Sequence, residues 1–197
     1  LRDSSRPTFL FGSTPPREGT SPEKARESCR KFVARSAVLA TDGYIVYDIQ
    51  DEKGRTHLER PFPFRKTLDP SWYATIMNDL SGKRSVVYKS VVEAELGVFD
   101  KWVENANDTH GHNTFVFVGA PSSKCEYKGP TLVEAMQHVR DSKTHSNCAF
   151  GSVCIPERHI KKGNEHLNML RKTENGAEWF ITQGIYDSGP LVGLLQQ

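Results

Sequence analysis

Two apolar runs near the end of the chain are each followed by polar side chains of the kinds that carry chemistry. Residues 147–155 form a mostly apolar run that stops at Pro156, and residues 177–187 contain a second such run. The polar residues at their ends are Glu157, Arg158, His159, Gln183, Tyr186 and Asp187. Carboxylates, an imidazole and an amide can serve as acids, bases and hydrogen-bonding groups toward a bound molecule.

A helical pattern lies between the two runs, from Asn164 to Thr173, and Gly176 can end it as the left-handed residue after a helix. Strand, helix and strand in this order form a βαβ unit, in which the strands are parallel and joined by a right-handed crossover. In barrels built from such units, active-site residues lie just past the carboxyl ends of the strands. The six polar residues are therefore predicted to lie at one edge of a parallel sheet.

The same alternation of strands and helices runs through the rest of the chain. Further strands are predicted at residues 8–11, 43–48, 84–89 and 114–118, and helices at residues 22–37, 69–82, 93–105 and 130–140. Two of these helices have a clear start, because Ser21 and Asp69 are N-cap residues that precede a proline. A charged connection that contains prolines, residues 50–66, is predicted after the second strand.

Six βα units of one polarity predict an α/β fold with a parallel sheet whose strand order follows the sequence. A (β/α)₈ barrel needs eight strands and typically about 250 residues. An open doubly wound sheet is the alternative architecture. Against a dinucleotide-binding sheet of that kind, the residues after the first strand, Gly12-Ser13-Thr14-Pro15-Pro16, contain no glycine-rich phosphate loop.

Composition excludes several classes of protein. The chain has 197 residues, 37% of them hydrophobic, which is enough for one domain with a core. A net charge of +2, from 26 basic and 24 acidic residues, argues against a nucleic-acid partner or a membrane-surface patch. No apolar run approaches the length of a transmembrane helix, so no direct membrane insertion is expected. The four cysteines lack CxxC spacing, which favours reduced thiols in an intracellular protein, mitochondrial or cytoplasmic, and no metal site is predicted.

Four landmarks occur in order along the chain. They are Pro15-Pro16 after the first strand, Gly119 at the end of the fourth, Ile155-Pro156-Glu157-Arg158-His159 after the fifth, and Ile181-Thr182-Gln183 in the sixth, preceded by Lys172, Gly176 and Ala177. In these landmarks the chain resembles the methylenetetrahydrofolate reductase family of flavin-binding (β/α)₈ barrels. The resemblance implies a TIM-type barrel with six of the eight βα units present. It would form a single domain over residues 1–197 that is incomplete at the C-terminus.

The resemblance also implies an FAD site. The residues that fall on cofactor-binding positions are Gly119, His159, Glu165, Asn168, Arg171 and Lys172. Asn168, Arg171 and Lys172 have the spacing i, i+3, i+4, so a helix would place them on one face. An amide, a guanidinium and an ammonium on one face would suit a pyrophosphate group. Glu165 lies near an acidic position that binds the ribose. Gln183 falls on a glutamine that contacts the folate and NAD(P)H substrates.

The chain departs from the family at the positions that carry its acid chemistry. The glutamate expected in the first strand, thought to be the general acid, is Gly12, and the aspartate expected after the fourth strand is Ala120. Since general acid catalysis typically contributes 10²- to 10⁴-fold, ordinary folate reduction is not expected. Other acids near strand ends are Glu157, Asp48 and Asp187, of which Glu157 is the favoured replacement and, with Gln183, the predicted catalytic pair.

Plainer interpretations exist for each of these residues. A basic helix face is often simply solvated, a histidine after a strand often caps a loop, and Glu157 could pair with Arg158. Two functions therefore remain open. One is an FAD-binding, reductase-like protein with altered or lost activity. The other is an inactive structural subunit of a larger, possibly mitochondrial, assembly, in which a partner chain or a continuation of this one covers the open sheet edges.

Overall fold

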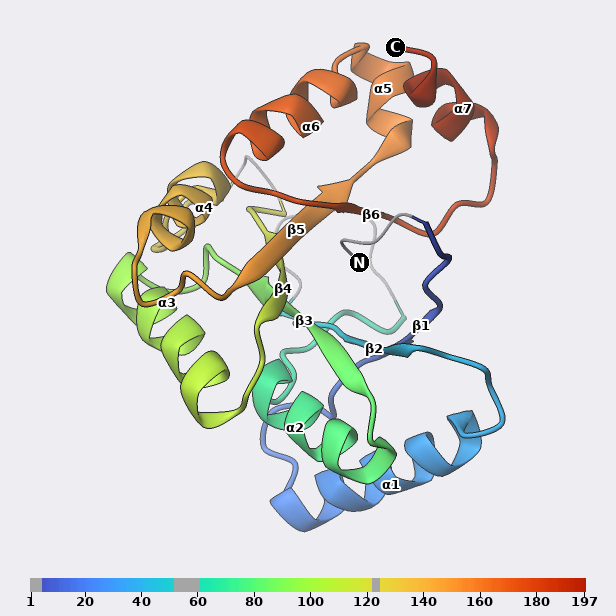
Figure 1. The fold of residues 1–197 in the computed structure, drawn as a ribbon, viewed down its shortest axis with the longest axis vertical. Coiled ribbons are helices and arrows are strands. Elements are labelled where there is room, and N and C mark those ends of the chain that lie inside the picture. The colour runs from blue at the N-terminus through green and yellow to red at the C-terminus, as the bar shows by residue number, and fades with distance from the viewer. Residues whose placement is uncertain (1–4, 52–60, 122–124) are drawn as a thin grey trace.

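The computed structural model describes residues 5–51, 61–121 and 125–197. In this part of the chain six strands form one sheet, every neighbouring pair is parallel, and the strand order follows the sequence. The strands are β1 (Leu10–Ser13), β2 (Gly43–Val46), β3 (Arg84–Ser90), β4 (Thr114–Val118), β5 (Ala149–Cys154) and β6 (Phe180–Thr182). The predicted parallel sheet is confirmed. It is curled into a half-barrel (Figure 1).

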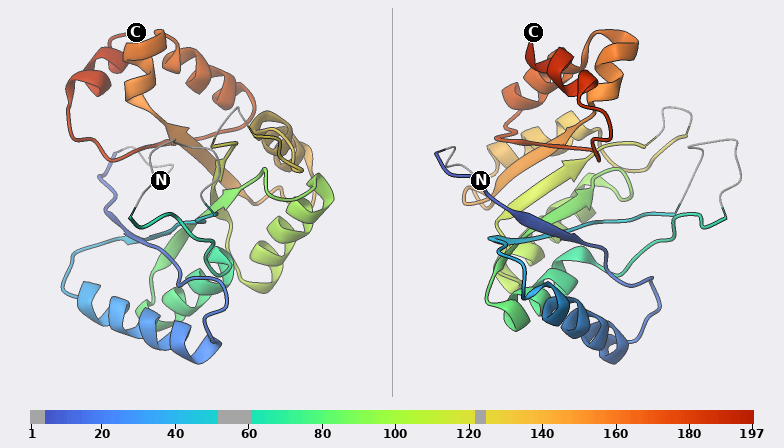
Figure 2. Two further views of the ribbon diagram at one scale, coloured as in Figure 1. Left: turned by 180° about the vertical axis from the view of Figure 1, so that it is seen from behind. Right: turned by 90° about the vertical axis from the view of Figure 1, so that its right-hand side faces the viewer.

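Seven α-helices accompany the sheet in the described residues, and Figure 2 shows them as a layer outside its curve. They are α1 (Pro22–Ser36), α2 (Pro70–Ser81), α3 (Leu96–Glu104), α4 (Leu132–Asp141), α5 (Pro156–Lys162), α6 (Glu165–Glu174) and α7 (Gly189–Leu195). A π-helical turn, η1 (Asn105–Thr109), continues α3. No helix in the described ranges is both long and apolar enough to cross a membrane. Of the predicted connection 50–66, residues 52–60 lie outside the described part of the chain.

The helix starts predicted from N-cap residues are confirmed. The carboxylate of Asp69 accepts hydrogen bonds from the backbone N–H groups of Ser71 and Trp72, at 2.9 and 3.0 Å. The hydroxyl of Ser21 accepts from the N–H of Lys24 at 3.4 Å. These bonds satisfy backbone donors that the first turn of a helix leaves free, so a short local signal fixes where each helix begins.

Alternating residues on each strand build two apolar layers. On β4, Phe115 and Phe117 are buried against the helices on the convex side, whereas Val116 belongs to a second cluster with Ile45 and Val86. Such alternation follows from the pleat of a strand, whose successive side chains point to opposite faces. The second cluster lines the concave side of the half-barrel, below the carboxyl ends of the strands.

The chain after β5 differs from the sequence prediction. Residues 156–162, where the sequence prediction placed polar residues past a strand end and no helix, form the short helix α5, which begins at Pro156 and ends before Gly163 with φ of 63°. A proline at the first helical position is a regular start signal, which the prediction used at Pro22 and Pro70 and overlooked here. Strand β6 has only three residues, fewer than the predicted run.

Candidate functional site

A cavity of about 570 Å³ opens at the carboxyl ends of strands β2 to β6. Its lining includes Tyr47, Asp48, Gln50, Tyr88, Ser90, Gly119, Ala120, Val153, Ile155, Arg158, Asn168, Arg171, Lys172 and Gln183. Barrels of βα units place their active sites at this edge. The volume lies within the range of small-molecule sites, about 300–1,000 Å³, so we treat the cavity as the candidate site.

Asp48 is an almost buried carboxylate in the wall of this cavity, with 5% of its side chain exposed. Its Oδ2 accepts a 2.8 Å hydrogen bond from the backbone N–H of Ser90, and its Oδ1 accepts a 2.7 Å bond from the amide of Gln50. The ammonium of Lys89 lies 3.8 Å from Oδ2 and 4.7 Å from the centre of the Trp102 ring. These contacts from β3 and from the segment after β2 hold the carboxylate in one orientation.

Burial raises the pKa of Asp48 above its ordinary value of 3.8. The ammonium of Lys89 and the N–H of Ser90 act in the opposite direction without cancelling this effect, and the carboxylate of Asp69 adds to the rise. A carboxyl group whose pKa is raised in a cleft is typical of functional sites, because it can hold a proton at a pH where an exposed aspartate cannot.

Asp48→Asn is expected to stabilise the fold above about pH 4 and to leave its stability unchanged at lower pH. The folded pKa lies above the unfolded one, so the wild type loses stability as the pH rises through the folded value, whereas asparagine stays neutral. Both hydrogen bonds can persist if the Gln50 amide turns over. Melting temperatures of both proteins across a pH series test this. A difference between them that does not change with pH would contradict it.

Gly12 faces the ring of Tyr47, which fills the space beyond it. A methyl group added to Gly12 would lie 2.8 Å from both Cε2 and the hydroxyl oxygen of Tyr47. The Tyr47 ring packs edge to face against Tyr88, with ring centres 5.0 Å apart and an angle of 64°. The position on which the resemblance places a catalytic glutamate therefore has neither a side chain nor, with Tyr47 in place, the room for one.

Gly12→Ala is expected to cost about 1–3 kcal/mol of unfolding free energy, because the added methyl group overpacks against Tyr47. Adding Tyr47→Leu should recover part of this cost, since it removes both close atoms. Urea unfolding of the wild type, both single variants and the double variant measures the coupling. Strictly additive effects would show that the two positions do not compete for space.

Helix α6 brings Asn168, Arg171 and Lys172 to the cavity, but they are not equally available. Arg171 is exposed. Asn168 donates a 3.0 Å hydrogen bond to the carboxylate of Glu165, and the ammonium of Lys172 donates to the carbonyl of Val153. Two of the three residues implied for a pyrophosphate are thus already engaged within the protein.

Glu165 is fully buried, and both of its carboxylate oxygens are used. Oε1 accepts from the N–H of Ile155 at 2.9 Å, and Oε2 accepts from Asn168. Burial lowers the pKa of the nearby Lys172, while the negative charge of Glu165 opposes that shift. Glu165 and Lys172 together fasten α6 to the end of β5. A contact between Glu165 and a ribose stays a prediction.

The two remaining predicted residues lie on α5 and are not among the cavity-lining residues of the described part of the chain. Glu157 is half-buried in the first turn of that helix. The ring of His159 lies against His166 of α6, with centres 5.3 Å apart. Gly119 and Gln183, by contrast, do line the cavity.

Asp48 and the pair Tyr47–Tyr88 are cavity residues to which the sequence prediction gave no leading role. Asp48 was one of three candidate acids, and the structure places it, rather than Glu157 or Asp187, in the cavity. A signal existed, since Asp48 closely follows a buried strand in the same way as Glu157. The choice between them depends on where α5 turns the chain, which the sequence pattern did not reveal.

The arrangement is that of an α/β half-barrel with a ligand-sized cavity at the carboxyl ends of its strands. Among solved structures, the chain is similar to an uncharacterized protein from Clostridium thermocellum that binds two copies of 5-methyl-5,6,7,8-tetrahydrofolic acid. The TM-score is 0.75 and the sequence identity 27%, over 96% of this chain and 58% of that one. The chain therefore spans little more than half the length of this neighbour. No protein-family model and no curated protein sequence matches the chain.

Proposed function

We propose that this chain is a divergent relative of the methylenetetrahydrofolate reductases that binds a reduced folate in its cavity without reducing it. The observation that carries the proposal is a cavity with aromatic, carboxylate, amide and guanidinium groups in a fold similar to a 5-methyltetrahydrofolate-binding protein. Folate binding by the neighbour is a property of that protein, and its extension to this chain is our inference.

The parts of a folate match the groups of the cavity. The pyrimidine half of the reduced pterin is flat and carries N–H donors, which suit the carboxylate of Asp48, and a carbonyl that suits the amide of Gln183. Tyr47 and Tyr88 offer an apolar, aromatic wall for the ring. The glutamate part of a folate is anionic, and the exposed Arg158 and Arg171 can pair with its carboxylates at the cavity rim.

Catalysis is excluded from the proposal for a chemical reason. Reduction of methylenetetrahydrofolate needs a proton donor that opens the methylene bridge and a carboxylate that stabilises the resulting cation. Gly12 and Ala120 supply neither group. Asp48 has a raised pKa, but each of its oxygens accepts a hydrogen bond, from Gln50 or from Ser90, so the group is held as an acceptor rather than as a proton donor.

FAD is the second candidate ligand, favoured by the presence of Asn168, Arg171 and Lys172 around the same cavity. Since Lys172 and Asn168 are engaged inside the protein, a cofactor phosphate would depend chiefly on Arg171. We therefore propose that the chain binds FAD more weakly than it binds a reduced folate.

Isothermal titration calorimetry with 5-methyltetrahydrofolate tests the folate proposal. We expect saturable binding to the wild-type chain, weakened about 10- to 100-fold by Asp48→Asn, because a charge-assisted hydrogen bond is lost. Asp187→Asn is the matched control, as it neutralises an exposed carboxylate that does not line the cavity. A parallel titration with FAD ranks the two ligands. Absent folate binding, or equal loss in both variants, would remove the proposal.

A further inference from the structure

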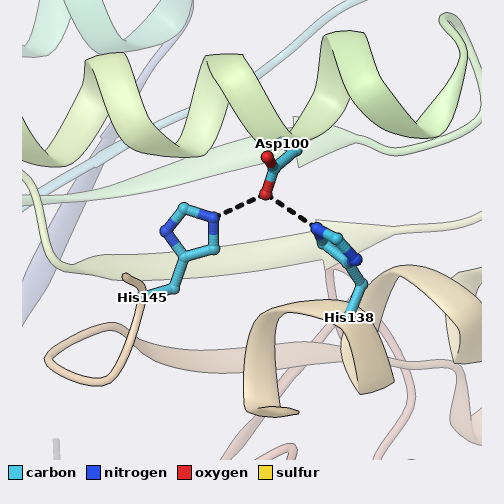
Figure 3. A group of neighbouring side chains, drawn as sticks. All are labelled: Asp100, His138 and His145. Atoms are coloured by element: carbon cyan, nitrogen blue, oxygen red, sulfur yellow. Dashed lines mark hydrogen bonds and ion pairs between the residues drawn. The ribbon is translucent and has the colours of Figure 1, made fainter. Parts of the chain in front are cut away.

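The helical layer on the convex side of the sheet holds two histidines and an aspartate around one point. Figure 3 shows Asp100 of α3, His138 of α4 and His145 of the turn after α4, with both imidazole rings directed at the carboxylate. Each Nε2 lies 2.7 Å from Oδ1 of Asp100, and the three candidate ligand atoms lie within 4.8 Å of one another. None of the three residues lines the cavity at the strand ends.

We propose that Asp100, His138 and His145 bind one Zn²⁺ ion. Two imidazoles and one carboxylate are ligands that zinc accepts, and three protein ligands with the remaining positions open to water are a regular zinc arrangement. The site is independent of the proposed folate cavity, and it goes beyond that function.

The electrostatics of the cluster favour a cation. When both imidazoles are neutral, the carboxylate of Asp100 gives the cluster one formal negative charge. Two neutral imidazoles and one carboxylate leave a bound divalent ion with a net charge of one, which water ligands on the exposed side can solvate.

The geometry needs only a small adjustment. Tetrahedral bonds of about 2.0 Å separate ligand atoms by roughly 3.3 Å, so the carboxylate must move back slightly from its hydrogen-bonded position. Asp100 has room for this, with 37% of its side chain exposed, whereas His145 is fixed by burial at 2%. Metal at Nε2 moves the ring hydrogen to Nδ1. For His145 the metal bond then replaces the Nε2 hydrogen bond to Asp100, and no other hydrogen bond of the described residues is lost, because Nδ1 has no partner there.

An open face for the ion exists beside His138. This residue borders a surface depression together with Leu96, Glu134 and Asp141. The carboxylate of Glu134 is engaged with Thr131 at the start of α4, at 2.8 Å, and that of Asp141 with Arg140, at 2.7 Å. Water is therefore the expected ligand on this side. The ion would join α3, α4 and the turn that leads into β5.

Zinc binding is measured on the full chain after removal of metal with a chelator, by competition with a chromophoric zinc chelator. We expect one site per chain. At about 100 times the dissociation constant, zinc should raise the melting temperature by roughly 5 °C or more. Asp100→Asn and His138→Ala should each weaken binding by at least about 100-fold, since loss of even an outer-shell partner typically costs 10- to 100-fold.

His110→Ala is the matched control, because it removes a histidine outside the cluster and should leave the affinity unchanged. Asparagine at position 100 still accepts a hydrogen bond, so a purely structural trio would tolerate it, and His138→Ala gives a second result if that variant fails to fold. The absorption spectrum of the chain with cobalt in place of zinc shows whether a cysteine is among the ligands, and we expect no thiolate band. No saturable zinc site in the wild type, wild-type affinity in both cluster variants, or a thiolate-to-cobalt charge-transfer band would overturn the proposal.

Discussion

Protein loaded with FAD and reduced anaerobically is expected to show no reoxidation by methylenetetrahydrofolate above the uncatalysed rate. A missing general acid alone lowers a rate by about 10²- to 10⁴-fold, and here the positions that the resemblance assigns to the acid and to the stabilising carboxylate hold Gly12 and Ala120. Stopped-flow absorbance of the flavin measures the reoxidation.

Two variants identify the cause if reoxidation is fast after all. Asp48 lines the cavity, and Glu157 does not. Reoxidation that disappears with Asp48→Asn and persists with Glu157→Gln would contradict our expectation and identify Asp48 as the replacement acid. Gly12→Glu is not expected to restore activity by itself, because the Tyr47 ring fills the space where the glutamate would extend.

The second large effect is a loss of stability on replacing Glu165 or Lys172, the two buried side chains of α6 that bind the end of β5. Glu165→Gln and Lys172→Met are each expected to destabilise the fold by about 1–3 kcal/mol, since the first removes the charge from a buried hydrogen-bond acceptor and the second leaves the carbonyl of Val153 without its donor. This corresponds to a fall in melting temperature of roughly 2–12 °C for a domain of this size. The double variant should lose less than the sum, because the negative charge of Glu165 supports the positive charge of Lys172.

Arg171→Met is the control for this pair. It removes a cation from the same helix, but from an exposed side chain, so we expect a change within about 0.5 kcal/mol. Denaturant unfolding of the four variants and the wild type gives the comparison. If Glu165→Gln and Lys172→Met cost no more than Arg171→Met, the pair is not structural, and both side chains are free to serve a ligand.

Much of the fold follows from local signals. Ser21 and Asp69 mark helix starts through hydrogen bonds that reach only two or three residues ahead, and the repeat of strand and helix determines a parallel sheet. Helix α5 was missed because a proline can end a strand or begin a helix. Only the chain that follows Pro156, up to the left-handed Gly163, decides between these outcomes.

The candidate site was harder to predict, because burial decides which polar side chains are available. Helical spacing predicts that Arg171 and Lys172 lie close together, yet one is exposed and the other donates to a strand carbonyl. Asp100, His138 and His145 have no local signature at all. His138 and His145 follow Asp100 by 38 and 45 residues along the chain. The packing of α3 against α4 and the following turn brings the three side chains together.

A crystal structure of this chain grown with 5-methyltetrahydrofolate tests the central claim most directly. We expect electron density for the pterin in the cavity at the carboxyl ends of β2 to β6, against Tyr47 and within hydrogen-bonding distance of Asp48. The glutamate part should lie near Arg158 or Arg171. Density for the folate elsewhere on the protein, with this cavity empty, would contradict the proposed site.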